Sequence, residues 1–140
     1  DEMKALVEAA GIPFYTTPQG RGVVPDDHEY SYLAMRSSAF RDADLIVVLG
    51  TRMNYIIGHA SPPRFGPNAK IARIDVDSVE IANAARYVDI PIVGDCKAVL
   101  GQLLDAIKGK ITPANFAAVA RRSVTMPRNC HDARGSSDCR

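Results

Sequence analysis

The sequence predicts an α/β protein built on a parallel sheet, and two observations support this. Apolar strands alternate with amphipathic helices along most of the chain, which is the pattern of parallel α/β domains. Two of these strands end in residues suited to hold a ligand, Gly50-Thr51-Arg52 and Asp75-Val76-Asp77. Ligands of open parallel sheets lie at the carboxyl ends of the strands, where an acidic residue can bind ribose hydroxyls. The expected fold is therefore a Rossmann-like parallel sheet with helices on both faces.

The first elements follow from hydrophobic spacing. Residues 1–10 predict an amphipathic helix, because apolar side chains recur at i, i+3, i+4 and i+7. A short strand is expected at residues 12–17, followed by a long connection at 19–28 and a short helix at 35–43.

The strongest strand signal lies at residues 44–50. Five successive apolar residues, Leu45 to Leu49, show no alternation and therefore predict a strand that is covered on both faces. Residues 51–65 are less regular, and we expect a helical turn there that ends before Pro62-Pro63.

The remaining elements repeat the alternation. They are a strand at residues 70–77, a helix at 78–85 capped by Ser78, a strand at 89–93 and a helix at 97–107 capped by Asp95.

The order of elements predicts an incomplete domain. A doubly wound domain normally opens on a strand and a glycine-rich phosphate turn, whereas this chain opens on a helix. We therefore expect an N-terminally truncated domain over residues 1–107, with the first strand missing. Residues 108–140 are expected to form a linker and a disordered tail, in which 113–122 could be a short helix.

Composition excludes several classes of function. The 140 residues are 46% hydrophobic and 24% charged, and the net charge of +1 gives no electrostatic case for binding nucleic acid. No apolar run approaches the length of about 20 residues that spans a membrane. Cys96, Cys130 and Cys139 form neither a disulfide framework nor a paired zinc motif, so we expect no metal site and a cytoplasmic location.

Five motifs in order resemble a known family, the central domain of thiamine diphosphate-dependent enzymes. They are TTPQGRGVVPDDH (16–28), RSSAFRDADLIVVLGTRMNY (36–55), PPRF (62–65), IDVD (74–77) and DIPIVGD (89–95). Within that family, the chain is most similar to 2-hydroxyacyl-CoA lyase and oxalyl-CoA decarboxylase, with acetolactate synthase close behind.

The resemblance implies a parent enzyme of three domains, forming or cleaving carbon–carbon bonds next to a carbonyl. Its N- and C-terminal domains would hold thiamine diphosphate and Mg²⁺ and supply the catalytic groups. The central domain carries no catalytic residue, and in some members it binds ADP or FAD. The resemblance also implies a homo-oligomer, either a dimer or a tetramer.

The family's nucleotide contacts carry over to six positions. Arg52 would lie over the adenine or pair with a phosphate, and Asp75 would accept the ribose hydroxyls. The Val76 backbone would border the adenine, as would the turn of Asp95 and Cys96. Gly50 would lie where backbone approaches the ligand. The chain departs from the family at Arg21, where lysine is usual, at Tyr55, where the CoA-using members carry tryptophan, and at His59.

Structural roles remain open for the same residues. Asp75 could cap the following helix, and Arg52 could pair only with an acidic neighbour such as Asp75. Asp26-Asp27-His28 is typical of a turn rather than of an acid–base site. Two other functions also remain open: a stand-alone nucleotide-binding module, and a scaffold whose nucleotide pocket is empty.

Overall fold

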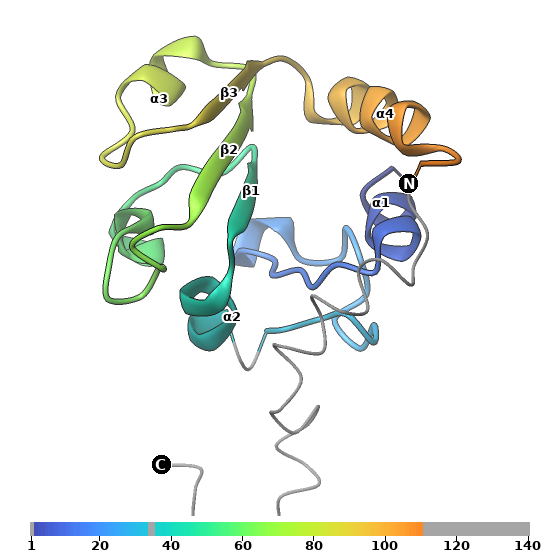
Figure 1. The fold of residues 1–140 in the computed structure, drawn as a ribbon, viewed down its shortest axis with the longest axis horizontal. Helices are drawn as coiled ribbons and strands as arrows, with labels where there is room; N and C mark the ends of the chain where they lie inside the picture. Colours follow the sequence, from blue (N-terminus) through green and yellow to red (C-terminus); the bar gives the residue numbers. More distant parts are fainter. Residues whose placement is uncertain (1, 34–35, 111–140) are drawn as a thin grey trace, which may run out of the picture.

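A computed structural model describes residues 2–33 and 36–110 of the chain. Its sheet has three parallel strands in the order β1-β2-β3, formed by Leu45–Leu49, Lys70–Asp75 and Ile90–Val93. Figure 1 shows helices on both sides of this sheet, with α3 on the left and α1 and α4 on the right. The predicted parallel α/β fold is confirmed.

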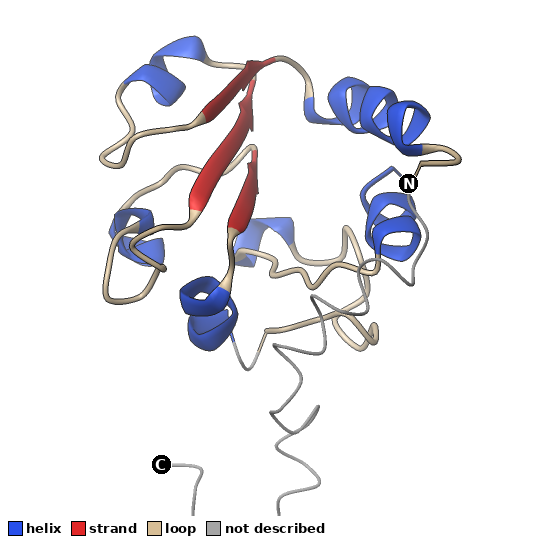
Figure 2. Cartoon of the chain, in the orientation of Figure 1, coloured by secondary structure: helices blue, strands red, loops and turns tan. Residues whose placement is uncertain are grey.

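The helices agree with the predicted ranges to within a few residues. They are α1 (Glu2–Ala10), α2 (Arg36–Asp42), α3 (Ser78–Ala82) and α4 (Cys96–Ile107), with short 3₁₀ segments η1 (Pro18–Gly20) and η2 (Tyr55–Ala60). Figure 2 shows how these helices and the strands alternate along the chain. The predicted short helix at 113–122 and the predicted tail lie outside the described residues.

Two helix caps test the expected N-termini. Asp95 caps α4, because its carboxylate accepts a hydrogen bond from the N–H of Ala98 at 2.9 Å. Asp77, not Ser78, caps α3, accepting from the N–H of Val79 at 2.8 Å. Aspartate and serine are both good N-caps, so sequence alone could not locate this helix start to one residue.

The predicted strand at residues 12–17 is wrong. This segment forms a single parallel bridge, between Phe14 and Ser31. The N–H of Phe14 donates to Tyr30 O and the N–H of Tyr32 donates to Phe14 O, at 2.9 and 3.0 Å. Pro13 has no N–H to donate, so the ladder has no donor there.

The expectation that β1 is covered on both faces is also wrong. Ile46 and Val48 are buried, but Leu45 and Val47 on the other face are 51% and 44% exposed. Helices α1 and α4 pack against each other, and α4 contacts β2. In the sheet formed by the described residues, β1 is thus an edge strand with an apolar outer face, and the backbone groups of such an edge can pair with another chain.

The main core lies between the loops around η2 and the face of the sheet that carries Ile46 and Val48. Phe40 and Phe65 stack there with ring centroids 4.5 Å apart. The buried members of this core are Ile46, Val48, Met53, Ile57, Ala60, Phe65, Ala69, Ile71, Ile81 and Val88.

A second, smaller cluster holds α1 against the connection that follows it. Val7, Phe14 and Val24 are its buried members. His28 lies beside this cluster. Its Nδ1 accepts the N–H of Tyr30 at 3.2 Å, and its Nε2 lies 3.6 Å from Glu8 Oε1. His28 therefore acts in turn structure, as the sequence analysis favoured.

The loop between η2 and β2 is held by one arginine. The Arg86 guanidinium donates to the carbonyls of Ala60 at 2.7 Å, Gly66 at 3.1 Å and Ala69 at 2.6 Å. His59 and Ala60 have φ of 52°, a left-handed conformation that costs free energy outside glycine. The Arg86 hydrogen bonds offset part of that cost.

We predict that Arg86→Met lowers the free energy of unfolding by about 2–3 kcal/mol, because it leaves three partly buried carbonyls without their charged donor. Urea denaturation followed by circular dichroism measures the change. Arg64→Met is the matched control: Arg64 donates one exposed hydrogen bond, to Ile56 O, and should cost less than about 1 kcal/mol. Equal losses for the two variants would contradict the role given to Arg86.

We also predict that the chain self-associates through the edge of β1. The double variant Leu45→Lys/Val47→Lys should reduce this association, because charged side chains on an edge strand oppose further pairing. Analytical ultracentrifugation over a concentration series measures it. Ile56→Lys removes a comparably exposed apolar side chain, 52% exposed on η2, and should leave association unchanged.

Candidate functional site

The ends of the three strands meet at one edge of the sheet. The N–H of Gly50 donates to Ile74 O and the N–H of Gly94 donates to Asp75 O, each at 2.9 Å. These bonds bring together the residues that follow β1, β2 and β3. The sequence-predicted site residues Gly50, Asp75 and Asp95–Cys96 therefore come from adjacent strand ends.

Gly50 has a conformation that favours glycine. Its φ is +53°, and a Cβ placed on it would lie 3.5 Å from Cys96 Sγ. The chain therefore turns sharply after β1, directly beside the first residue of α4. The positive φ, rather than a lack of space, is what favours glycine at this position.

Asp75 is nearly buried and already has two donors. Its Oδ2 accepts from the Arg73 guanidinium at 3.1 Å, and its Oδ1 accepts from the N–H of Asp77 at 3.1 Å. Each carboxylate oxygen retains a further lone pair, so ribose hydroxyls could still donate to it. Val76 beside it is 69% exposed and offers an apolar surface at the same edge.

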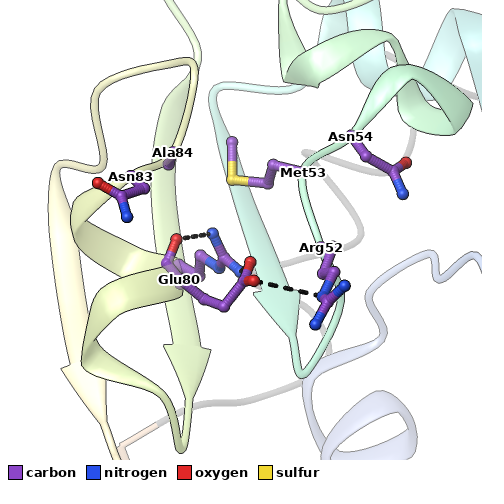
Figure 3. A pocket seen from close by; sticks show the side chains of 7 residues that line it. Arg52, Met53, Asn54, Glu80, Asn83 and Ala84 are labelled. Atoms are coloured by element: carbon purple, nitrogen blue, oxygen red, sulfur yellow. Dashed lines mark hydrogen bonds and ion pairs between the residues drawn. The ribbon is translucent and has the colours of Figure 1, made fainter.

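Arg52 pairs with a different residue from the one the sequence suggested. Its Nε lies 3.3 Å from Glu80 Oε1 on α3, and the proposed pairing with Asp75 is replaced by the Arg73–Asp75 pair. Figure 3 shows the Arg52 and Glu80 side chains directed toward each other across a small pocket.

Arg73 is the residue that the sequence analysis missed. Its side chain is only 1% exposed and donates to Asp75 Oδ2, to Glu80 O and, at 3.5 Å, to Glu80 Oε2. Among the residues that the structure describes, its Nε is a buried donor without a hydrogen-bond partner. The signal was available: an arginine between two apolar residues of a strand (Ala72 and Ile74 in KIARID) requires a carboxylate nearby when it is buried, and Asp75 follows two residues later.

The pocket between Arg52 and α3 has a volume of about 120 Å³, and Arg73, Glu80 and Asn83 help to line it. Pockets for drug-sized ligands are typically about 300–1,000 Å³. This pocket is therefore too small to enclose a ligand of that size.

Neither a metal-binding cluster nor a membrane-spanning helix is found among the described residues. Within residues 2–33 and 36–110, no group of three or more His, Cys, Asp and Glu side chains is arranged to hold a metal ion. None of the helices in those ranges is long and apolar enough to cross a bilayer.

Cys96 is a half-buried thiol at the start of α4. Burial raises its pKa, and the negative charges of Asp75 and Asp95 raise it further. Its thiol lies 3.9 Å from Ile74 O. The raised pKa keeps the Cys96 thiol protonated at neutral pH, and this lowers its reactivity because the thiolate is the nucleophile.

We predict that Asp95→Asn speeds alkylation of Cys96. Asparagine still caps α4 but removes a negative charge, so the thiol pKa falls and more thiolate is present at a given pH. Iodoacetamide labelling at pH 8, followed by peptide mass spectrometry, measures the rate at Cys96. In the unchanged chain the rate should still be rising above pH 9; a plateau below pH 8 would contradict the raised pKa.

Comparison with known proteins places these features in a family. The family model described as "Thiamine pyrophosphate enzyme, central domain" matches residues 1–103. The 2-hydroxyacyl-CoA lyase of Arabidopsis thaliana is 42% identical over 108 residues, which is 77% of this chain and 18% of that protein.

Two further relatives extend the comparison. Human 2-hydroxyacyl-CoA lyase 1 is 39% identical over 107 residues, 76% of this chain and 18% of its own length. The acetolactate synthase of Mycobacterium avium is 35% identical over 125 residues, 83% of this chain and 20% of its own length. The chain thus spans about a fifth of the length of these relatives. It belongs to the thiamine pyrophosphate enzyme family and corresponds to the central domain of those enzymes.

Proposed function

We propose that this chain is the nucleotide-binding central domain of a thiamine diphosphate-dependent enzyme of the 2-hydroxyacyl-CoA lyase or acetolactate synthase type. The observation that carries the nucleotide assignment is the meeting of Gly50, Asp75 and Gly94 at one edge of the sheet. A turn without a side chain, a strand-end carboxylate and a helix start lie together there, as in other nucleotide-binding parallel sheets.

The parent enzyme would form or cleave a carbon–carbon bond next to a carbonyl, and this chain would not supply the reacting groups. Thiamine diphosphate supplies an electron sink for the carbanion in such reactions. We expect it to be held with Mg²⁺ by the N- and C-terminal domains, in a cytoplasmic homo-oligomer. Asp77 and Asp95 cap helices, and Asp75 and Glu80 form ion pairs, which supports a structural role for this domain.

Within the domain, we assign the nucleotide contacts by chemistry. The Asp75 carboxylate would accept the ribose hydroxyls, using the lone pairs that Arg73 and the Asp77 N–H leave free. Arg52, whose side chain is 76% exposed, would pair with a phosphate or lie over the adenine. The exposed Val76 would border the adenine ring beside Cys96.

A scaffold with an empty pocket is the second candidate. It is favoured by one observation: Arg52, Asp75 and Asp95 each already have a partner within the chain, Glu80, Arg73 and the Ala98 N–H respectively. A stand-alone nucleotide-binding module would share the site of the first proposal and differ only in having no catalytic partner domains.

Calorimetric titration with ADP and FAD separates these candidates. We expect binding, and we expect Asp75→Asn to weaken it by about tenfold or more, because a hydrogen bond to a charged acceptor contributes about 1.5–3 kcal/mol. Asp77→Asn is the matched control. It removes the same charge two residues away and preserves the α3 cap, so affinity should change little.

Absence of binding by both nucleotides would overturn the nucleotide assignment and favour the scaffold. Circular dichroism of Asp75→Asn checks that loss of the Arg73 partner has not unfolded the sheet. Equal weakening by Asp75→Asn and Asp77→Asn would show a general charge effect and contradict the assigned ribose contact.

A further inference from the structure

Glu80 tethers the exposed arginine of the candidate site. Arg52 is 76% exposed, yet its Nε lies 3.3 Å from Glu80 Oε1. Glu80 is less exposed, at 33%, and its second oxygen lies 3.5 Å from the buried guanidinium of Arg73. The position of Arg52 is therefore set from the interior, through Glu80.

The same buried guanidinium also holds the other ligand-binding group. Arg73 NH2 lies 3.1 Å from Asp75 Oδ2. Four charges of alternating sign thus run from Arg52 through Glu80 and Arg73 to Asp75. The two ends of this charge chain are the groups that would bind phosphate and ribose.

The Glu80 carboxylate is consequently paired with the Arg52 guanidinium, which is the group that would bind a phosphate. An incoming diphosphate must take Arg52 from Glu80 and then remain close to the released carboxylate. Where Arg52 pairs with the phosphates rather than lying over the adenine, a nucleoside without phosphates meets neither obstacle, because it has no group that competes with Glu80 for Arg52.

We propose that Glu80 is a specificity-determining residue of this site, whose carboxylate competes with the ligand's phosphates for Arg52. It thereby sets how strongly the site prefers nucleoside diphosphates to nucleosides. This inference rests on the proposed function, namely that a nucleotide binds at these strand ends. Because the Arg52–Glu80 pair is largely exposed, Glu80 tunes affinity rather than blocking the site.

A purely structural role for Glu80 makes a different prediction. Glu80 lies in the first turn of α3, where a negative charge interacts favourably with the helix dipole. Loss of that interaction would lower stability, and it would change the affinities for ADP and adenosine equally or not at all. The ratio of the two affinities therefore separates the two roles.

The test is calorimetric titration of the 140-residue chain with ADP and with adenosine, before and after Glu80→Gln. Glutamine keeps an oxygen acceptor for Arg73 but loses the charge that holds Arg52. We expect ADP to bind about two- to five-fold more tightly, the range set by exposed ion pairs, while adenosine affinity stays unchanged.

Two further variants control the interpretation. Glu29→Gln removes the same charge from an exposed loop position outside α3 and the strand ends, and it should alter neither affinity. In an Arg52→Gln background, Glu80→Gln should no longer tighten ADP binding, since the competition has been removed. This double-mutant cycle isolates the coupling between the two side chains.

The outcomes distinguish this inference from the proposal on which it rests. If the unchanged chain binds ADP but Glu80→Gln leaves the ratio of ADP to adenosine affinity unaltered, Glu80 does not compete for Arg52 and only this inference fails. A persisting effect in the Arg52→Gln background overturns it equally. If the unchanged chain binds neither ligand, the nucleotide function fails and this inference fails with it.

Discussion

The buried guanidinium of Arg73 is the interaction on which the arrangement of the strand ends depends. A charge with 1% exposure is stable only if carboxylates compensate it, and here Asp75 and Glu80 do so from β2 and α3. Removing either carboxylate would leave part of that charge uncompensated in the interior. The position of α3 relative to β2 is therefore constrained by charge as well as by apolar packing.

This constraint determines what the strand ends can offer to a ligand. Asp75 faces the edge of the sheet with both oxygens already oriented by donors, so its remaining lone pairs point in fixed directions. Arg52 is linked to Arg73 indirectly, because Glu80 contacts both guanidinium groups. A preorganised carboxylate and a tethered but exposed guanidinium suit a ligand that carries both hydroxyls and negative charge.

The open edge of β1 is the other consequence of this architecture. Its inner residues, Ile46 and Val48, are buried against the core around η2, whereas Leu45 and Val47 remain exposed. The two helices beyond that face pack on each other instead.

The sequence alone determined the fold class, the three parallel strands, the cap of α4 and the grouping of Gly50, Asp75 and Cys96. The strands and the cap follow from local patterns, because apolar runs and N-caps involve residues close together in the chain. The grouping follows from the rule that the carboxyl ends of parallel strands meet at one edge of the sheet, together with the family resemblance. Only the tertiary structure decided which partner each charge takes, that residues 12–17 form one bridge, and that β1 has an exposed face. Those outcomes depend on which elements become neighbours in space: Arg52 follows β1 and meets Glu80 from α3, and the same Glu80 reaches Arg73 on β2.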